Sequence, residues 1–196
     1  MKKGIFITMY GINNIGKSTH CKRLCRTLEE KGYKTKYIKY PVYEISPTGS
    51  FLYQTLRTEG PQKISEDELQ MWFILNRYQY QNELKKLLED GYVVVAEDYS
   101  GTGIAWGTAK GLDQHWLIEM NKFLLKEDLA IMLDGRRNFF AKEKVHVHEQ
   151  NDALVDKCRE VHKDLAKKFN WKIVNIQPKI KDTAEMIFNI VDEFLR

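Results

Sequence analysis

The sequence predicts an α/β protein in which a five-stranded parallel sheet carries helices on both faces. Five short segments have the apolar, β-rich composition of strands, and stretches of helical composition alternate with them along the chain. Continuous apolar runs such as YVVVA and LAIML are typical of strands that are buried on both faces of a sheet. The expected strands span residues 4–9, 34–39, 92–96, 129–133 and 171–176.

Stop and start signals mark the expected helices between these strands. A helix over residues 19–31 ends at Gly32, and a long helix over residues 66–89 opens with a capping box at Ser65. A last amphipathic helix begins near Asp182. Because ligands bind at the carboxyl ends of strands in parallel sheets, we expect functional residues directly after the first four strands.

Length and charge limit the classes of protein to consider. A chain of 196 residues suits a single domain, here expected over residues 1–196. Its 31 Lys and Arg against 27 Asp and Glu give a net charge of +4 that is spread along the chain. No basic arm indicates a nucleic-acid partner, and no apolar run is long enough for a membrane span. Three cysteines without framework spacing favour reduced thiols and a cytoplasmic location.

The segment after the first strand fits the pattern G-x-x-x-x-G-K-[S/T]. Gly11 allows a turn, Gly16 allows close approach of the backbone to phosphate oxygens, and the following helix N-terminus favours an anion. Lys17 would reach the terminal phosphates, and the Ser18 hydroxyl would bind Mg²⁺. The residues predicted to bind ATP are therefore Gly11, Ile12, Asn13, Asn14, Ile15, Gly16, Lys17, Ser18 and Thr19.

The strand–loop–helix context of this pattern predicts a three-layer P-loop NTPase fold. The bound phosphates are then those of a nucleoside triphosphate, and we expect ATP with Mg²⁺ as the cofactor.

With this loop in place, the chain resembles the thymidylate kinase family of nucleoside monophosphate kinases over nearly its whole length. The opening GIFITMYGINNIGKSTHCKRL is similar to the family's first strand and loop, and YPVYEISPTGSFL looks like its segment after the second strand. FILNRYQY resembles the helix with a Phe and an Asn-Arg pair. VVVAEDYSGTGIAWGTAKG resembles the Asp-Arg-Tyr segment, and HEQNDALVDKC resembles the lid-side stretch.

The resemblance implies which residues bind the base of the acceptor and which handle the metal and the phosphates. Phe73 would stack on the thymine ring, and Arg77, four residues later on the same helix face, would read a base oxygen. A carboxylate at Glu97 or Asp98 would hold Mg²⁺ or orient the acceptor. The implied residues are Lys17, Glu97, Asp98, Arg136 and Arg137 for catalysis; Ser18 and Glu97 for the metal; and Tyr43, Phe73, Arg77, Tyr99, Thr102 and Gly103 for the substrate.

Four further expectations concern the surroundings of the site and the assembly of the protein. Residues 100–103 (SGTG) read as a flexible substrate-side loop, and Trp106 either lines the nucleoside pocket or belongs to the core. A lid around residues 136–151 would bring its cations over the γ-phosphate. The family's members pair through helices, so a homodimer is implied.

The chain departs from the family's pattern at three arginines. The segment over residues 11–18, here called the phosphate loop, carries no arginine at residues 13–15, where some members of the family have one. This absence favours a positive charge supplied by the lid. Val42 and Tyr43 stand where an arginine is expected after Pro41, and Asp98 replaces the arginine of Asp-Arg-Tyr. In the family, the arginines at these last two positions hold the acceptor's phosphate, whereas a carboxylate at Asp98 would repel it. The cations that could substitute are Lys39, Arg57 and Lys110.

These observations predict transfer of the ATP γ-phosphate to dTMP, which gives dTDP. Two alternatives stay open on the sequence. One is a kinase of another deoxynucleotide or of a deoxynucleoside, and the other is a non-catalytic nucleotide-binding switch.

Overall fold

A computed structural model describes residues 4–57, 62–135 and 152–196 of the chain. Five strands form one sheet in the order β2-β3-β1-β4-β5, and every neighbouring pair is parallel. This confirms the predicted sheet, and each strand agrees with its predicted range to within one residue at either end. The strands are β1 (Ile5–Tyr10), β2 (Thr35–Lys39), β3 (Val93–Glu97), β4 (Leu129–Asp134) and β5 (Lys172–Asn175).

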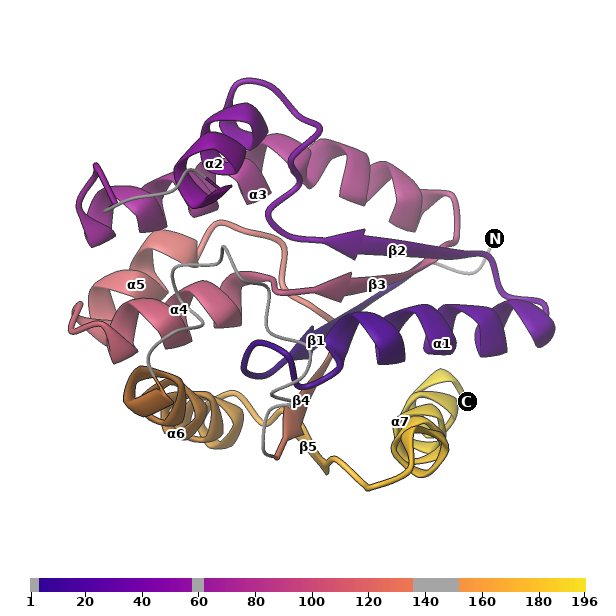
Figure 1. Ribbon diagram of the computed structural model, residues 1–196. Helices are drawn as coiled ribbons and strands as arrows, with labels where there is room; N and C mark the ends of the chain where they lie inside the picture. The colour runs from indigo at the N-terminus through magenta and orange to yellow at the C-terminus, as the bar shows by residue number, and fades with distance from the viewer. Residues whose placement is uncertain (1–3, 58–61, 136–151) are drawn as a thin grey trace.

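Helices alternate with these strands and lie on both sides of the sheet (Figure 1). The carboxyl ends of the strands meet at one edge, where α2 and α4 also lie. The described helices are α1 (Lys17–Glu30), α2 (Thr48–Arg57), α3 (Glu66–Glu89), α4 (Ser100–Ala109), α5 (Gln114–Asn121), α6 (Asp152–Lys168) and α7 (Ile180–Leu195).

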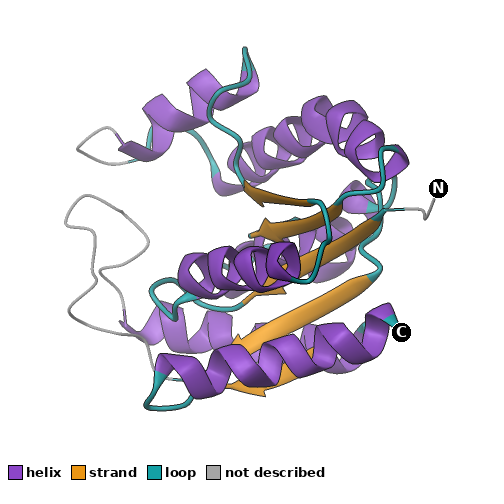
Figure 2. Cartoon of the chain, turned by 90° about the vertical axis from the view of Figure 1, so that its right-hand side faces the viewer, coloured by secondary structure: helices purple, strands orange, loops and turns teal. Residues whose placement is uncertain are grey.

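Alternate residues of the central strand face two separate cores. Ile7 and Met9 of β1 are buried among side chains of α1 and α7. Phe6 points the other way and is buried with Leu84 of α3. Because successive strand residues point to opposite faces, an uninterrupted apolar strand requires a helix layer on each side. Figure 2 shows the sheet between these two layers.

The long helix α3 begins and ends as the sequence predicts. The Ser65 hydroxyl accepts a hydrogen bond from the backbone N–H of Glu68 at 3.4 Å, as expected of an N-cap. Within the helix, buried Asn76 is hydrogen-bonded to the segment after β2. Its Oδ1 accepts from the Val42 N–H at 2.8 Å, and its Nδ2 donates to the Val42 carbonyl at 2.9 Å and to Thr48 Oγ1 at 3.1 Å. These bonds fix that segment and the start of α2 against α3.

The prediction that residues 100–103 form a flexible loop is wrong, because they are the first turn of α4. Glycine and threonine have low helix propensity, so the local sequence favours a loop there. Packing overrides this preference. A Cβ on Gly101 would lie 2.4 Å from the Trp171 ring and 2.9 Å from the Tyr10 ring, so only glycine fits at this contact.

In the parts of the chain that the structure describes, no helix has the length and apolar character needed to cross a bilayer.

Candidate active site

The phosphate loop connects β1 to α1 at the carboxyl edge of the sheet. Gly11 and Gly16 have φ values of 135° and 104°, which glycine adopts without steric cost. A Cβ on Gly11 would also lie 2.7 Å from the Leu133 carbonyl oxygen of β4. The side chains of Ile12 and Ile15 are buried in the core beneath the loop. The apolar positions therefore anchor the loop, and the backbone between them faces the site.

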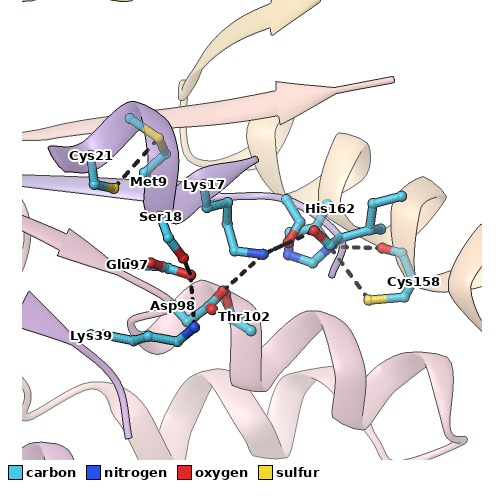
Figure 3. Close-up of polar contacts among 12 residues, drawn as sticks. Met9, Lys17, Ser18, Cys21, Lys39, Glu97, Asp98, Thr102, Cys158 and His162 are labelled. Atoms are coloured by element: carbon cyan, nitrogen blue, oxygen red, sulfur yellow. Dashed lines mark hydrogen bonds and ion pairs between the residues drawn. The ribbon is translucent and has the colours of Figure 1, made fainter. Parts of the chain in front are cut away.

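Lys17 is buried, and its ammonium group lies against the loop that carries it. Nζ donates to the carbonyl oxygens of Gly11 and Ile12 at 2.9 Å each and lies 3.4 Å from Asp98 Oδ1 (Figure 3). A buried cation needs such partners. Lys17 is thus held at the mouth of the phosphate loop, where the terminal phosphates of a bound nucleotide would compete for its charge.

Glu97 ends β3 and binds three side chains from two neighbouring elements, α1 and β2. The Ser18 hydroxyl donates to Glu97 Oε1 at 2.8 Å, the Tyr37 hydroxyl donates to Oε2, and Lys39 Nζ lies 3.2 Å from Oε1. Burial alone would raise the pKa of Glu97, but the charges of Lys17 and Lys39 and these hydrogen bonds hold it below its ordinary value. The carboxylate is therefore ionised at neutral pH.

The oxygen atoms of Ser18 and Glu97 fit a magnesium site. They are 2.8 Å apart beside the phosphate loop, and Mg²⁺ prefers carboxylate and hydroxyl oxygens together with nucleotide phosphates. Among the residues that the structure describes, no group of three or more His, Cys, Asp or Glu could hold a metal ion by itself. The donor set thus suits a cation that arrives with a nucleotide.

Asp98 turns its carboxylate into the same space. Its backbone has a φ of 63°, a left-handed conformation that aspartate tolerates better than most residues. Thr102 Oγ1 donates to Asp98 Oδ1 at 3.0 Å. Burial, together with the negative charge of Glu97, raises the pKa of Asp98 despite the nearby Lys17. The site therefore holds two carboxylates side by side, facing two lysines.

The other end of the site contains a buried arginine with unsatisfied donors. Arg77 is 4% exposed, and its Nε and Nη1 have no hydrogen-bond partner among the described residues. Its guanidinium lies 6.0 Å from the centre of the Phe73 ring, and Gly103 leaves room for it. Burial lowers the pKa of Arg77. A ligand with an oxygen acceptor and a flat ring would satisfy both side chains.

A cavity of about 530 Å³ joins the two ends. It is large enough for a nucleotide-sized ligand. Its lining includes most of the residues predicted from the sequence, which are Asn13, Asn14, Ile15, Gly16, Lys17, Ser18, Thr19, Tyr43, Phe73, Arg77, Glu97, Asp98, Thr102 and Gly103.

The remaining predicted residues lie elsewhere. Gly11 and Ile12 are behind the lining and reach the site only through the carbonyl oxygens that bind Lys17. Tyr99 is 1% exposed, packs edge-on against Phe6, and lies behind the cavity wall. For Trp106 two interpretations stayed open, a core residue or a residue of the nucleoside pocket, and the structure supports both. Trp106 is 7% exposed within the core and also lines the cavity. The predicted lid over 136–151, with Arg136 and Arg137, lies outside the described residues.

Some lining residues were missed by sequence reasoning. Gln70 lies three residues before Phe73 and seven before Arg77, so helical spacing could have placed it on the same face. The segment between β5 and α7, with Gln177 and Pro178, also lines the cavity. It lies at the phosphate-loop edge only because β5 is parallel to β4, so no local signal could have found it.

Comparison with known proteins agrees with this geometry. The family model "Thymidylate kinase" matches residues 10–187. The chain is 30% identical over 203 aligned positions to the probable thymidylate kinase of Thermococcus gammatolerans, covering 97% of each chain. It is 27% identical over 195 positions to the thymidylate kinase of Dictyostelium discoideum, covering 98% of this chain and 86% of that protein.

A solved structure supports the fold. The thymidylate kinase of Candida albicans superimposes with a TM-score of 0.82 at 22% sequence identity, covering 97% of this chain and 92% of that chain. The three-layer arrangement is thus that of a P-loop NTPase. Since the family model spans nearly the whole chain, and the phosphate loop and the Phe73–Arg77 pair share one cavity, this protein belongs to the thymidylate kinase family.

Proposed function

We propose that this protein is an ATP-dependent nucleoside monophosphate kinase that transfers the γ-phosphate of ATP to dTMP, giving ADP and dTDP. The observation that carries the proposal is Arg77. A buried arginine with unsatisfied donors, placed beside Phe73 in the cavity that the phosphate loop also lines, suits a pyrimidine with a carbonyl oxygen. Names of relatives such as the Dictyostelium discoideum thymidylate kinase point to the same acceptor.

The phosphate loop would bind the donor. Its backbone N–H groups and the N-terminus of α1 would receive the phosphates, and Lys17 would exchange its contacts with Gly11 and Ile12 for contacts with phosphate oxygens. Exchange of one set of oxygen acceptors for another keeps the buried charge of Lys17 compensated throughout. The loop is therefore built before the nucleotide arrives.

Ser18 and Glu97 would hold Mg²⁺ with the bound nucleotide, and the ion would supply positive charge to the phosphate oxygens. Asp98 and Thr102, which are hydrogen-bonded to each other, would line the path between donor and acceptor. Arg136 and Arg137 of the predicted lid would add charge over the transferred group. Catalysis in such a site rests on positioning and charge neutralisation.

The direct test is ADP release that depends on an acceptor, measured with ATP and Mg²⁺ and with dTMP, dUMP, dGMP, dCMP or thymidine. We expect dTMP to give the highest turnover. Turnover with thymidine but not with dTMP would replace the proposal with a deoxynucleoside kinase, which the carboxylate at Asp98 favours. Binding of ATP without turnover on any acceptor would indicate a nucleotide-binding switch.

We also infer a homodimer that pairs through α3. Met71, Leu75 and Tyr78 lie along one face of this helix and are 37%, 51% and 46% exposed. Three large apolar side chains at such spacing favour an interface between two copies of the chain. Sedimentation velocity should give a dimer, and Leu75→Glu should give a monomer, with Lys85→Glu on the same helix as the control. A monomeric wild-type protein would contradict the inference.

A cytoplasmic site of action completes the proposal. Cys21, Cys25 and Cys158 are all free and buried, which suits a reducing compartment. Fractionation of cells that make the tagged protein should recover it with cytoplasmic markers, and recovery in a secreted or membrane fraction would contradict the assignment.

A further inference from the structure

The proposed function brings a negatively charged phosphate into a part of the cavity that already holds two carboxylates. Glu97 and Asp98 both face the space between the phosphate loop and the base end. A nucleoside monophosphate brings a phosphate with nearly two negative charges into that space. Without a cation dedicated to it, this phosphate would be repelled by the two carboxylates.

Four cationic side chains among the described residues line the cavity: Lys17, Lys39, Arg57 and Arg77. Two of them are engaged elsewhere. Lys17 is bound to the phosphate loop's own carbonyls, which places it at the donor end. Arg77 is buried beside the Phe73 ring, which places it at the base end.

Arg57 and Lys110, the other two cations that the sequence offered for the acceptor's phosphate, fit it less well than Lys39 does. Arg57 ends α2, whose Leu52 and Leu56 pack in one cluster with Phe73, so it belongs to the cover of the base end. Lys110 is paired with Glu66 and does not line the cavity. Lys39 is the remaining cation on the described wall between donor and base.

The position of Lys39 follows from the register of the sheet. Lys39 is the last residue of β2 and lies opposite Glu97, the last residue of β3. Its Nζ lies 3.2 Å from Glu97 Oε1, the same oxygen that accepts the Ser18 hydroxyl at 2.8 Å. Figure 3 shows the side chain reaching across from β2 toward Glu97 and Asp98. The Lys39 side chain is 54% exposed, so its ammonium group can move on a flexible stem.

We propose that Lys39 binds the 5′-phosphate of the acceptor. In the absence of nucleotide Lys39 is paired with Glu97, and this ion pair breaks when a divalent cation binds the Glu97 oxygens. This inference rests on the proposed function. Because Mg²⁺ and Lys39 compete for the same carboxylate, binding of the metal with the donor nucleotide releases Lys39 toward the acceptor. Donor and acceptor-phosphate binding are then positively coupled, and the coupling acts equally in both directions.

The test is a set of binding measurements by isothermal titration calorimetry. The dissociation constants of dTMP and of thymidine are measured with a non-hydrolysable ATP analogue, once with Mg²⁺ and once with EDTA. The ratio of the two constants isolates the contribution of the phosphate. In the wild-type protein we expect this ratio to favour dTMP more strongly when Mg²⁺ is present.

Variants then assign the effect to one side chain. Lys39→Met should weaken dTMP binding roughly 10- to 100-fold, the usual effect of losing a charge-assisted hydrogen bond, and leave thymidine binding unchanged. It should also remove the difference between Mg²⁺ and EDTA. Lys39→Arg should retain part of the preference for dTMP. Lys36→Met, an exposed lysine on the same strand, is the matched control and should behave as wild type.

The outcomes separate the inference from the function on which it rests. If wild-type protein binds and phosphorylates dTMP but Lys39→Met keeps the full preference, the inference is overturned and the function stands. Loss of that preference in Arg57→Met alone would also overturn it. A preference for dTMP that is equal in Mg²⁺ and EDTA would show that Mg²⁺ does not release Lys39 from Glu97, and would overturn that part of the inference. Wild-type protein that neither binds nor phosphorylates dTMP would remove both.

Discussion

Lys17 is the side chain in the phosphate loop whose contacts we expect to change most when a nucleotide binds. It is held by two carbonyl oxygens of its own loop and by the Asp98 carboxylate. Each of these partners is an oxygen that a phosphate can replace. The fold thus gives the buried ammonium group oxygen partners before any ligand binds, and a phosphate that replaced them would keep its charge compensated.

Replacement of Lys17 by alanine should nearly abolish phosphate transfer. Removal of a preorganised cation from the transferred group costs transition-state stabilisation, and we expect kcat to fall by at least roughly 100-fold. Steady-state kinetics of ADP release measures this fall, with Lys36→Ala as a control on an exposed lysine. Turnover close to that of the wild type would contradict the mechanism.

Gly103 is a second residue whose identity we expect to matter for the acceptor. An added Cβ would lie 3.1 Å from Arg77 Nη2 and 3.1 Å from Gln70 Oε1. Gly103→Ala should therefore displace the guanidinium and lower kcat/KM for dTMP roughly 10- to 100-fold, while the KM for ATP stays the same. Kinetics with each substrate varied in turn gives both values. An equal loss for both substrates would show that Arg77 does not read the base.

At the scale of elements, the joint between α2 and α3 shapes the base end of the cavity. Asn76 on α3 satisfies both backbone groups of Val42 and also donates to Thr48 at the start of α2. Leu52 and Leu56 of α2 then pack on Leu69 of α3. One buried amide therefore sets the position of the segment that carries Tyr43 into the cavity lining.

Asn76→Ala should destabilise the protein by about 2–3 kcal/mol, because it leaves the Val42 N–H and carbonyl buried without partners. Urea denaturation monitored by circular dichroism measures the change in the free energy of unfolding. Ser65→Ala, which removes only the N-cap of the same helix, should cost about 1 kcal/mol. If the two variants were equally stable, the amide would not be holding the joint.

For the whole molecule, His162 links folding to pH. It is fully buried on α6, where Nδ1–H donates to the Cys158 carbonyl at 2.9 Å and Nε2 has no partner among the described residues. Burial, with a smaller effect of the positive charge of Lys17, lowers the pKa of His162 to about 4. The folded protein therefore keeps this imidazole neutral at pH values where the unfolded chain protonates it.

The free energy of unfolding should fall as the pH is lowered from about 6.5 to about 4. In this window the unfolded state binds a proton at His162 that the folded state does not, and the loss reaches up to about 3 kcal/mol. His162→Asn keeps a donor for the Cys158 carbonyl and removes this titration. Urea denaturation at a series of pH values should give a shallower dependence for His162→Asn than for the wild type. Equal slopes would show that His162 does not contribute.

The elements that could be predicted from the sequence are those with a local signal. The five strands are marked by apolar runs, α3 by the cap at Ser65, and the phosphate loop by glycines and Lys17 at fixed spacing. α4 could not be predicted, because its glycine- and threonine-rich sequence disfavours a helix and only its packing against neighbouring elements makes it one.

By itself, the sequence determined the parallel sheet, the phosphate loop and the spacing of Phe73 and Arg77, since periodicity and motif spacing are properties of the chain alone. The tertiary structure alone decided which residues of different elements meet. Lys39 lies on Glu97 because β2 and β3 pair in that register, and Gln177 reaches the cavity because β5 follows β4 at the sheet edge. Contacts between distant segments depend on the whole packing of the sheet and helices, so no stretch of sequence carries them.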